Sequence, residues 1–308
     1  MNGRLMVAGL YGMSALFHVR ELPTAGETVT SSGMIFEGGG KGYNQAISAL
    51  RMGASVFFVT AVGEDVFGKD AENVFRNDGL RSWKLIQKPA TPTAFAAVCT
   101  DSHSENIVIV EQGAMQKLTE KDVKALSSEM ARCKMLLIQL ETAPEINECL
   151  IKLASQYGVA VMLNPAPARE DSRHLLRMVD LATPNYGEAL TLCGYDASEH
   201  VDPEQLCREI RQMGCKNVII TLGKEGCCAL DEQGIFYLQS AFNVDAVDTV
   251  GAGDTFNGAL AASLLKGYDL KQSVRIATAA SAISVTRRGA VAGIPDKTEV
   301  MEFLSTRK

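Results

Sequence analysis

The chain has 308 residues, which is enough for one large domain or two smaller ones with a sizeable core. Its formal net charge is −6 and it has no run of five or six Lys or Arg, which argues against a nucleic-acid partner. No segment approaches roughly 18 uninterrupted apolar residues and the start does not look like a signal peptide, so we expect no membrane-spanning helix and no membrane partner.

Along the chain, short apolar runs alternate with helical patterns. Buried strands are predicted at 5–10, 56–62, 135–140, 159–164, 179–183 and 218–222. Helices are predicted after the glycines at 38–40, at 66–78, around 143–157 and at 203–213. Continuous apolar strands that alternate with helices indicate a parallel sheet covered on both faces.

Two hairpin-like stretches interrupt this alternation. The first, 17–36, contains Pro23, Gly26 and alternating polar and apolar residues, and the second contains short strands at 93–100 and 106–110. We therefore expect a small β lid beside the main domain. The lid comprises residues 13–37 and 91–110, and the α/β domain comprises residues 1–12, 38–90 and 111–308.

The most informative stretch runs from Asp248 to Phe256. Gly251, Ala252 and Gly253 precede a predicted helix, so their backbone N–H groups and the helix dipole would form an anion site that can hold a transferring phosphoryl group. Asp254 follows directly, where it could accept a proton from an attacking hydroxyl. The simpler alternative is an aspartate that only caps the helix.

A second glycine-rich stretch, 38–45, opens the predicted early helix. Its glycines would let the backbone approach a ligand, and Lys41 and Asn44 supply donors suited to hydroxyl groups. The alternative is a plain helix start with a solvated lysine. No Walker motif is present, and no G-x-G-x-x-G opens the first βαβ unit, which excludes a dinucleotide-dependent oxidoreductase.

These two stretches together resemble the ribokinase family of carbohydrate kinases. The early motif matches 39–45, the late signature matches 248–258, and further matches in the same order are 26–28, 139–141, 164–168 and 183–185. The resemblance extends over nearly the whole chain. It implies a ribokinase-like three-layer α/β/α fold with a mostly parallel central sheet and a β lid, and ATP-dependent phosphorylation of a small sugar such as ribose or deoxyribose.

The resemblance also implies roles for individual residues. Asp254 matches the base, and the backbone of Gly251, Ala252 and Gly253 matches the anion hole. The positions that match sugar contacts are Gly12, Ser14, Gly40, Lys41, Gly42, Tyr43, Asn44 and Glu141. Those that match nucleotide contacts are Asn185, Thr221, Gly223, Lys224, Gly226, Gly253 and Thr278.

Two metal ions are implied in the same way. Glu188, with Asn185, matches an element that organises Mg²⁺ indirectly. A monovalent cation, K⁺, would be held by Asp248 and by the carbonyls of Val250, Ser284, Arg287 and Gly289. A further side-chain oxygen of that site would fall at Gly293, which has none.

The sugar end departs from the family pattern. Ribokinase carries Asn-x-Asp where this chain has Gly12, Met13 and Ser14, and an unmade hydrogen bond to a charged acceptor costs roughly 1.5–3 kcal/mol. Tyr43 replaces a small residue and is expected to add bulk near the pocket. Ribose, a deoxy sugar or another polyol remain candidates, and Ser14 or a residue of the lid could replace the lost contacts.

Two other functions remain open: a nucleoside kinase of the same fold, or a non-catalytic sugar- or nucleotide-binding regulator. The intact Asp254 and glycine turn argue against the regulator. Exposed-edge strand material in 17–36 favours a homodimer through the lid. The eight cysteines show no disulfide-like spacing, which favours a reducing, cytoplasmic location.

Overall fold

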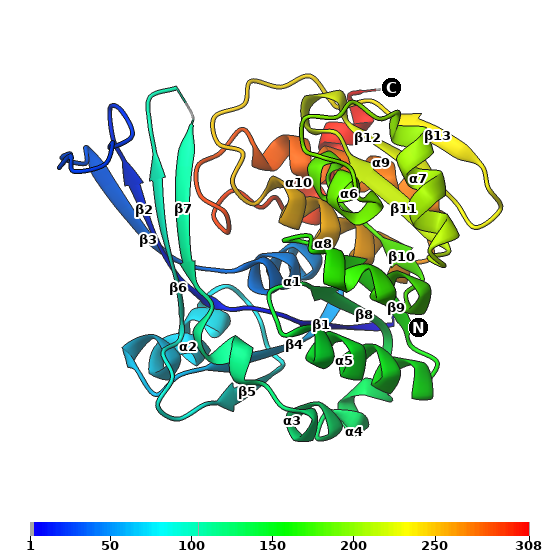
Figure 1. Cartoon of the computed structure of the whole chain (residues 1–308), viewed down its shortest axis with the longest axis horizontal. Helices are drawn as coiled ribbons and strands as arrows, with labels where there is room; N and C mark the ends of the chain where they lie inside the picture. Colours follow the sequence, from blue (N-terminus) through cyan, green and yellow to red (C-terminus); the bar gives the residue numbers. More distant parts are fainter. Residues whose placement is uncertain (1–2, 104, 308) are drawn as a thin grey trace.

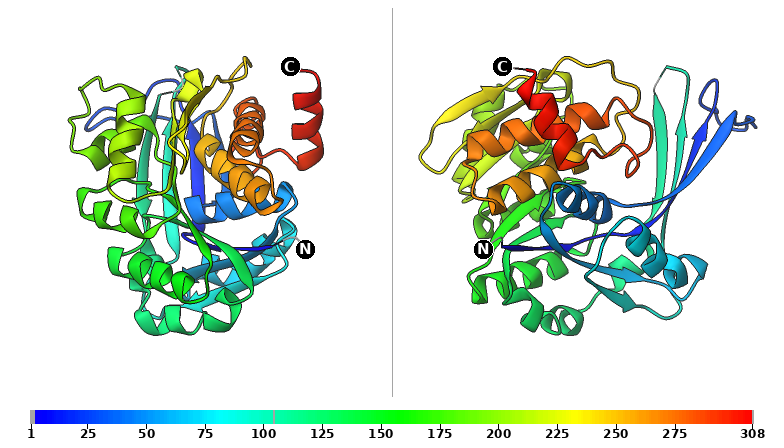
Figure 2. Two further views of the ribbon diagram at one scale, coloured as in Figure 1. Left: turned by 90° about the vertical axis from the view of Figure 1, so that its right-hand side faces the viewer. Right: turned by 180° about the vertical axis from the view of Figure 1, so that it is seen from behind.

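A nine-stranded sheet and a separate four-stranded sheet make up the β structure of the computed structural model, which describes residues 3–103 and 105–307. Helices cover both faces of the larger sheet, and the smaller sheet stands beside it (Figures 1 and 2). Within the described residues, no helix is both long enough and apolar enough to cross a membrane.

The large sheet has the order β13-β12-β11-β10-β9-β8-β1-β4-β5. From β11 to β5 each neighbouring pair is parallel, whereas β12 and β13 are added antiparallel. The strands are β1 (Arg4–Ala8), β4 (Ser55–Val62), β5 (Trp83–Gln87), β8 (Cys133–Gln139), β9 (Ala160–Asn164), β10 (Leu181–Ala182), β11 (Asn217–Thr221), β12 (Cys227–Leu230) and β13 (Phe236–Gln239).

Alternation along the strands separates two hydrophobic cores. In β1, Leu5 and Val7 belong to one buried cluster and Met6 and Ala8 to the other, because successive side chains point to opposite faces. The first cluster includes residues of α1 (Lys41–Arg51), α2 (Val66–Asn77), α8 (Ala252–Leu265), α9 (Leu270–Ser284) and α10 (Lys297–Ser305).

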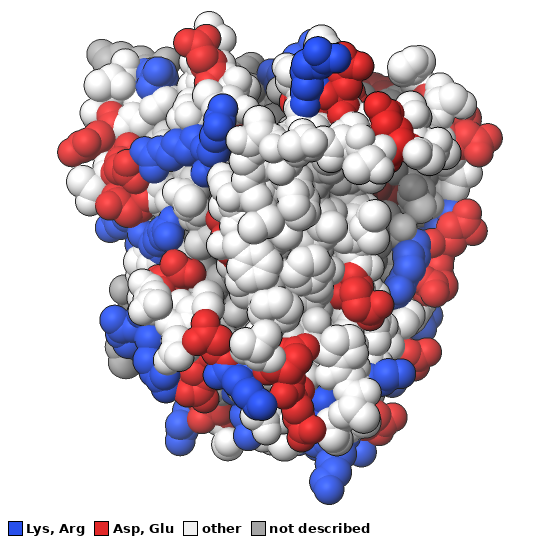
Figure 3. All heavy atoms as spheres, turned by 90° about the vertical axis from the view of Figure 1, so that its left-hand side faces the viewer, with Lys and Arg blue, Asp and Glu red and all other residues white. Residues whose placement is uncertain are grey.

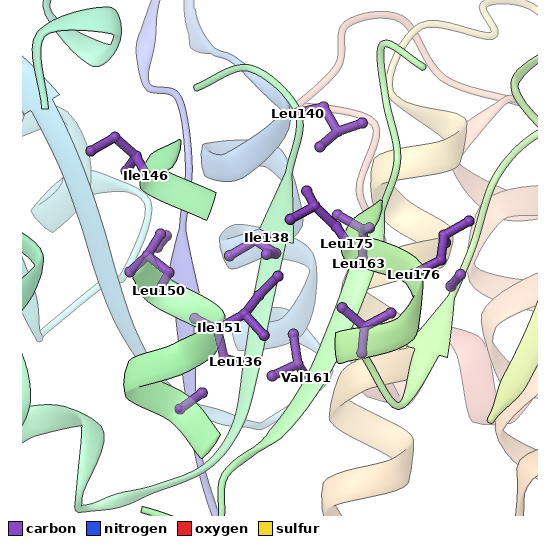
Figure 4. Close-up of a cluster of buried hydrophobic side chains, with 14 of the residues drawn as sticks. Leu136, Ile138, Leu140, Ile146, Leu150, Ile151, Val161, Leu163, Leu175 and Leu176 are labelled. Atoms are coloured by element: carbon purple, nitrogen blue, oxygen red, sulfur yellow. The ribbon is translucent and has the colours of Figure 1, made fainter. Parts of the chain in front are cut away.

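The second cluster lies on the opposite face. It includes residues of η1 (Gly113–Lys117), α3 (Glu120–Lys124), α4 (Ser127–Met130), α5 (Pro144–Gln156), η2 (Glu170–Met178), α6 (Tyr186–Cys193) and α7 (Pro203–Gln212). Part of it is drawn in Figure 4, where leucine, isoleucine and valine side chains of β8, β9, α5 and η2 gather together. A short 3-10 turn, η3 (Gly223–Glu225), follows β11.

The small sheet joins the two hairpin-like stretches. Its order is β3-β2-β6-β7, with β2 (Gly12–His18), β3 (Gly33–Gly39), β6 (Ala94–Thr100) and β7 (Asn106–Glu111). Each hairpin is antiparallel, but β2 pairs with β6 in parallel, so two segments distant in sequence lie side by side (Figure 1).

The predicted fold class is therefore confirmed, with differences of detail. The sequence patterns did not indicate β5, β12, β13 or α10. The strand expected at 179–183 is reduced to Leu181–Ala182, although the N–H groups of Asp180 and Thr183 still donate to Val161 and Leu163 of β9.

The sheet order positions a ligand site. The chain proceeds outward from β1 through β4 to β5 on one side and from β8 to β11 on the other, so the direction reverses between β1 and β8. In open α/β sheets, ligands bind beyond the carboxyl ends of the strands at such a point. Glu141 follows β8 and Asn164 ends β9, which brings polar residues to this edge.

Helix α1 packs closely against α8, and the absence of a side chain at Gly258 makes this close approach possible. A Cβ atom at Gly258 would lie 2.5 Å from the Cβ of Ser48 and 2.7 Å from the backbone N of Ala49. We expect Gly258→Ala to lower the stability by about 1–3 kcal/mol, even though alanine favours a helix over glycine by about 1 kcal/mol. Thermal denaturation checks this.

Gly187→Ala in α6 is the matched control. A Cβ there has one neighbour, at an ordinary 3.6 Å, so its melting temperature should stay level or rise. Equal melting temperatures for the Gly258 variant and the wild type would contradict this account of the packing.

Candidate active site

Asp254 lies in the first turn of α8 and is held by two side-chain amides from α1. The Nδ2 of Asn44 donates to Asp254 Oδ2 over 2.9 Å, and the Nε2 of Gln45 donates to Oδ1 over 2.9 Å. The carboxylate is almost completely buried. Both donors approach from the protein side, so Asp254 has a fixed orientation and does not cap its own helix.

Gln45 extends this arrangement into the sheet. Its Nε2 also donates to Asn164 Oδ1 over 3.0 Å, and its Oε1 accepts from Gln139 Nε2 over 2.6 Å. Gln45 was not among the predicted site residues. A signal was present, because Lys41, Asn44 and Gln45 are spaced i, i+3 and i+4 and therefore share one helix face.

The turn before Asp254 has the geometry of an anion site. Gly251, the N-cap of α8, has φ 75°, a left-handed conformation that favours glycine. A Cβ at Gly253 would have no neighbour within 4 Å, so the space in front of this residue is open. The N–H groups of a first helical turn have no partner within the helix. That of Ala252 donates to the carbonyl of Thr249 over 3.2 Å, whereas among the described residues those of Gly253 and Asp254 have no acceptor and are available to an anion.

One lysine, Lys41, lies close to three carboxylates, those of Asp254, Glu141 and Glu188. Glu141 Oε2 accepts the backbone N–H of Lys41 over 3.1 Å at the start of α1. Burial alone would lower the pKa of the Lys41 ammonium, but Asp254, Glu141 and Glu188 outweigh this and raise it. Lys41 is therefore a partly buried cation within a group of negative charges.

The same environment acts on the carboxylates. Burial raises the pKa of Glu141 to about 7; Lys41 opposes the rise and Asp254 adds to it. Burial also raises the pKa of Glu188. Glu188 and Asn185 form a reciprocal capping box at the start of α6, with 2.8 Å hydrogen bonds in both directions, so this pair also has a structural role.

Several predicted sugar contacts face elsewhere. The expectation that Tyr43 adds bulk near the pocket is wrong: its ring is fully buried against Tyr11, Phe58 and Phe75, and its hydroxyl donates to Asp78 over 2.5 Å.

Two of the glycines predicted to contact the sugar, Gly42 and Gly12, also lie against the protein backbone. A Cβ at Gly42 would lie 2.5 Å from the Cα of Gly9, so Gly42 faces the backbone just after β1 rather than a ligand. Gly12 is pressed against the backbone of Ala94. Gly40, with φ 101° at the N-cap of α1, and Ser14, half-buried on β2, remain beside the site.

Two adjoining cavities meet at the anion turn. The smaller, about 240 Å³, is lined by Lys41, Asn164, Glu188 and Asp254 among others. The larger, about 430 Å³, is more apolar and is lined by residues from the η3 turn, the 241–249 loop, α8 and α9. Thr221, Thr249, Ala252 and Gly253 line both. One ligand could therefore extend from the larger cavity across the turn to Asp254.

The predicted nucleotide contacts are divided between these cavities. Gly223, Lys224, Gly226 and Thr278 line the larger one, and Asn185 lines the smaller one. The Thr278 hydroxyl donates to the carbonyl of Val274, so its side chain presents mainly a methyl group. Sequence reasoning did not single out Phe256 and Val285, which line the larger cavity as apolar residues of α8 and just after α9.

The predicted cation-binding segments also come together. Asp248 accepts the N–H groups of Val250 and Gly289, each over 3.0 Å, which joins the loop before α8 to the loop after α9. The carbonyl oxygens of Ser284 and Gly289 lie 3.1 and 2.8 Å from the point that a Cβ of Gly293 would occupy. The side chain of Arg287 pairs with Glu299.

Comparison with known proteins agrees with this geometry. Residues 4–297 match the model of the pfkB family carbohydrate kinases. The ribokinase of Haemophilus influenzae is 35% identical over 304 residues (99% of each chain), and the deoxyribokinase of Salmonella typhi is 30% identical over 307 residues (98% of each chain). The structure of Arabidopsis thaliana ribokinase has a TM-score of 0.86 and 28% identity, covering 99% of each chain. The chain therefore belongs to the pfkB family of carbohydrate kinases and is a phosphotransferase that acts on a sugar hydroxyl.

Proposed function

We propose that this kinase transfers the γ-phosphoryl group of ATP to a hydroxyl of a ribose-type sugar, with Asp254 as the general base. One observation carries the proposal: the two cavities share the Ala252–Gly253 turn, and Asp254 lies on the side of the smaller one. The nucleotide would occupy the larger cavity, the sugar would lie next to Asp254, and the phosphoryl group would cross the turn.

Asp254 can take the proton that the reaction releases. As the sugar oxygen attacks the γ-phosphorus, its O–H bond breaks and the proton moves to Asp254, while the bond from phosphorus to the leaving oxygen of ADP breaks. Asn44 and Gln45 each donate one hydrogen bond to the carboxylate, so both of its oxygens keep free lone pairs for a hydroxyl.

The start of α8 and Lys41 stabilise the charge that develops on the phosphoryl oxygens. The N–H groups of Gly253 and Asp254, which bond to no acceptor among the described residues, and the positive end of the α8 dipole lie beside the open space at Gly253. The Lys41 ammonium lies in the same cavity as Asp254. These groups are fixed before the substrates bind, so they need little reorganisation during the reaction.

The nucleotide and Mg²⁺ fit the residues present. The larger cavity is lined by the apolar residues Phe256 and Val285, which suit a purine ring, and the structure of the related Arabidopsis ribokinase is a complex with ribose and ATP. Mg²⁺ usually keeps several waters and binds one or two carboxylates plus substrate phosphates. Glu188, in the smaller cavity, could orient such a hydrated ion, which would neutralise phosphate charge when bound.

Potassium is the proposed monovalent cation. The Asp248 carboxylate and the carbonyls of Ser284 and Gly289 support this, because carboxylate and carbonyl oxygens suit a hard, weakly held ion. The cation would stabilise the loop in which Gly289 donates its N–H to Asp248, next to the Gly251–Gly253 turn.

The acceptor is proposed to be ribose, 2-deoxyribose or a closely related sugar. The two relatives named above are a ribokinase and a deoxyribokinase, at similar identity. The Tyr43 ring lies in the core and does not shape this pocket. The difference from the family pattern therefore lies in the small sheet, where Gly12 and Ser14 provide no carboxylate.

The small sheet is proposed to act as a lid and as a dimer interface. Met34, Phe36, Ile107 and Ile109 are exposed on one face of it, and Figure 3 shows a broad surface without charged residues on this side of the molecule. A second copy would cover this apolar face.

A reducing cytoplasm is the proposed location, since the thiols are free and several, including Cys207 and Cys215, pack as small buried hydrophobes.

An ADP-release assay over pentoses, deoxypentoses, hexoses and nucleosides tests the function. We expect turnover with a ribose-type sugar, and a higher rate in K⁺ than in Na⁺. Asp254→Asn should lower kcat on the order of 10²-fold or more, because the amide cannot accept the proton. Calorimetry should show unchanged ATP binding.

Asp269→Asn is the matched control, because Asp269 caps the start of α9 and asparagine caps equally well. Near-normal turnover in the Asp254 variant would refute its role as base. No ADP release from the wild type with any compound would refute the proposed function.

Sugar binding should depend on the ionisation of Glu141. Its pKa is raised to about 7, so the carboxylate becomes charged as the pH rises through that value, and a charged carboxylate accepts hydroxyl hydrogen bonds more strongly. We expect the sugar Kd, measured by calorimetry without nucleotide, to fall between pH 6 and 8. Glu141→Gln should weaken binding and remove this dependence, whereas exposed Glu145→Gln should keep it. A Kd independent of pH in the wild type would contradict the prediction.

The dimer is tested by light scattering at micromolar concentration. We expect a dimer for the wild type and a monomer for Ile109→Glu, because a buried unpaired carboxylate opposes association. Leu238→Glu is the control: Leu238 on β13 is as exposed as Ile109, 67% against 69%, but lies away from the small sheet. A monomeric wild type would count against the interface.

A further inference from the structure

The small sheet has two faces with different chemistry. The strand register places Phe36, Ala15, Ala97 and Ile109 in one row on the apolar face described above. The neighbouring row, on the opposite face, consists of Glu37, Ser14, Ala96 and Val110. We call the whole face that carries Glu37 and Ser14 the inner face. Among its described residues, Glu37 is the acidic one.

Glu37 and Ser14 are direct cross-strand partners, so their Cβ atoms are about 5 Å apart on the same face. The Ser14 hydroxyl oxygen lies 2.6 Å from the position that a Cβ on Gly39 would take. Gly39 leads directly into Gly40 and Lys41 at the start of α1. The pair therefore lies where the inner face runs into the acceptor site.

One oxygen of the Glu37 carboxylate is anchored. Glu37 Oε1 accepts the backbone N–H of Ala290 over 2.9 Å. Its Oε2 lies 3.1 Å from the point that a Cβ on Gly289 would occupy, and the backbone N–H of Val291 is a second donor near the carboxylate. Two donors leave part of the accepting capacity of a carboxylate unused. Burial raises the pKa of Glu37. The side chain is thus a partly desolvated acceptor with unused capacity.

Ala290 connects Glu37 to the catalytic turn. A Cβ at Gly251, the N-cap of α8, would lie 3.1 Å from the Cα of Ala290. Glu37 is therefore separated from the Gly251–Asp254 turn by a single residue, although it comes from a different sheet. From this position, its free oxygen can face a sugar that is held between the turn and the inner face.

We infer that Glu37 accepts hydrogen bonds from a sugar hydroxyl remote from the reacting one and so contributes to substrate specificity. The inference rests on the proposed function. A sugar presents several O–H donors, and a carboxylate is the side chain that only accepts. Hydrogen bonds to a charged acceptor are stronger than neutral ones, and Ser14 alone cannot supply one. Glu37 thus provides from β3 a carboxylate that β2 lacks.

The test compares Glu37→Gln with the wild type on ribose, 2-deoxyribose and other deoxy or epimeric pentoses. We expect the sugar KM to rise about 10- to 100-fold, with kcat and the ATP KM changed less than about threefold. For at least one analogue that lacks the contacted hydroxyl, the penalty should disappear. The double variant Ser14→Asp, Glu37→Ala, which moves the carboxylate to the neighbouring strand, should recover part of the lost affinity.

Glu111→Gln is the matched control, because Glu111 is a carboxylate of the same sheet on the opposite face. A sugar KM within threefold of the wild type for Glu37→Gln would overturn the inference. The inference would also be overturned if Glu37→Gln raised the KM equally for all sugars and lowered the melting temperature of the protein. That result would show that the bond to Ala290 only stabilises the small sheet. Both results require a wild type that phosphorylates a sugar, so they are distinct from a failure of the proposed function.

Discussion

The hydrogen bonds from Asn44 and Gln45 to Asp254 are the interaction on which the site depends. They join α1 to α8, although the two helices are far apart in sequence. Gly258 allows the helices to approach closely enough for these bonds. Gln45 then connects the pair to β8 and β9 through Gln139 and Asn164, so the Asp254 carboxylate is fixed relative to the sheet.

Local patterns predicted most of the fold and indicated the glycine turn before Asp254. The Gly251–Asp254 turn needs glycine for its backbone conformation and its open approach, and both requirements are visible in the sequence. The apolar runs of the parallel strands were equally clear. The failures concern residues whose direction depends on the helix: Tyr43 lies next to Asn44 in sequence but about 100° around α1, which turns its ring into the core.

Contacts between distant segments could not be predicted in this way. Glu37 lies within a strand that shows no motif, and the role inferred for it depends on its register with Ser14 and on the loop at Ala290. The joining of the two cavities at Thr221 and Gly253 likewise needs the arrangement of several separate segments. Sequence spacing contains no information on these distances.

The parallel pairing of β2 with β6 has a consequence for how the chain folds. The hairpins on either side of this seam can each form locally, but the seam itself needs α1, β4, α2 and β5 to be synthesised and placed first. Closing a loop of that length costs entropy before any contact is gained, and such long-range pairings are slow. The small sheet is therefore completed later than either of its hairpins, and the edges of β2 and β6 need protection until then.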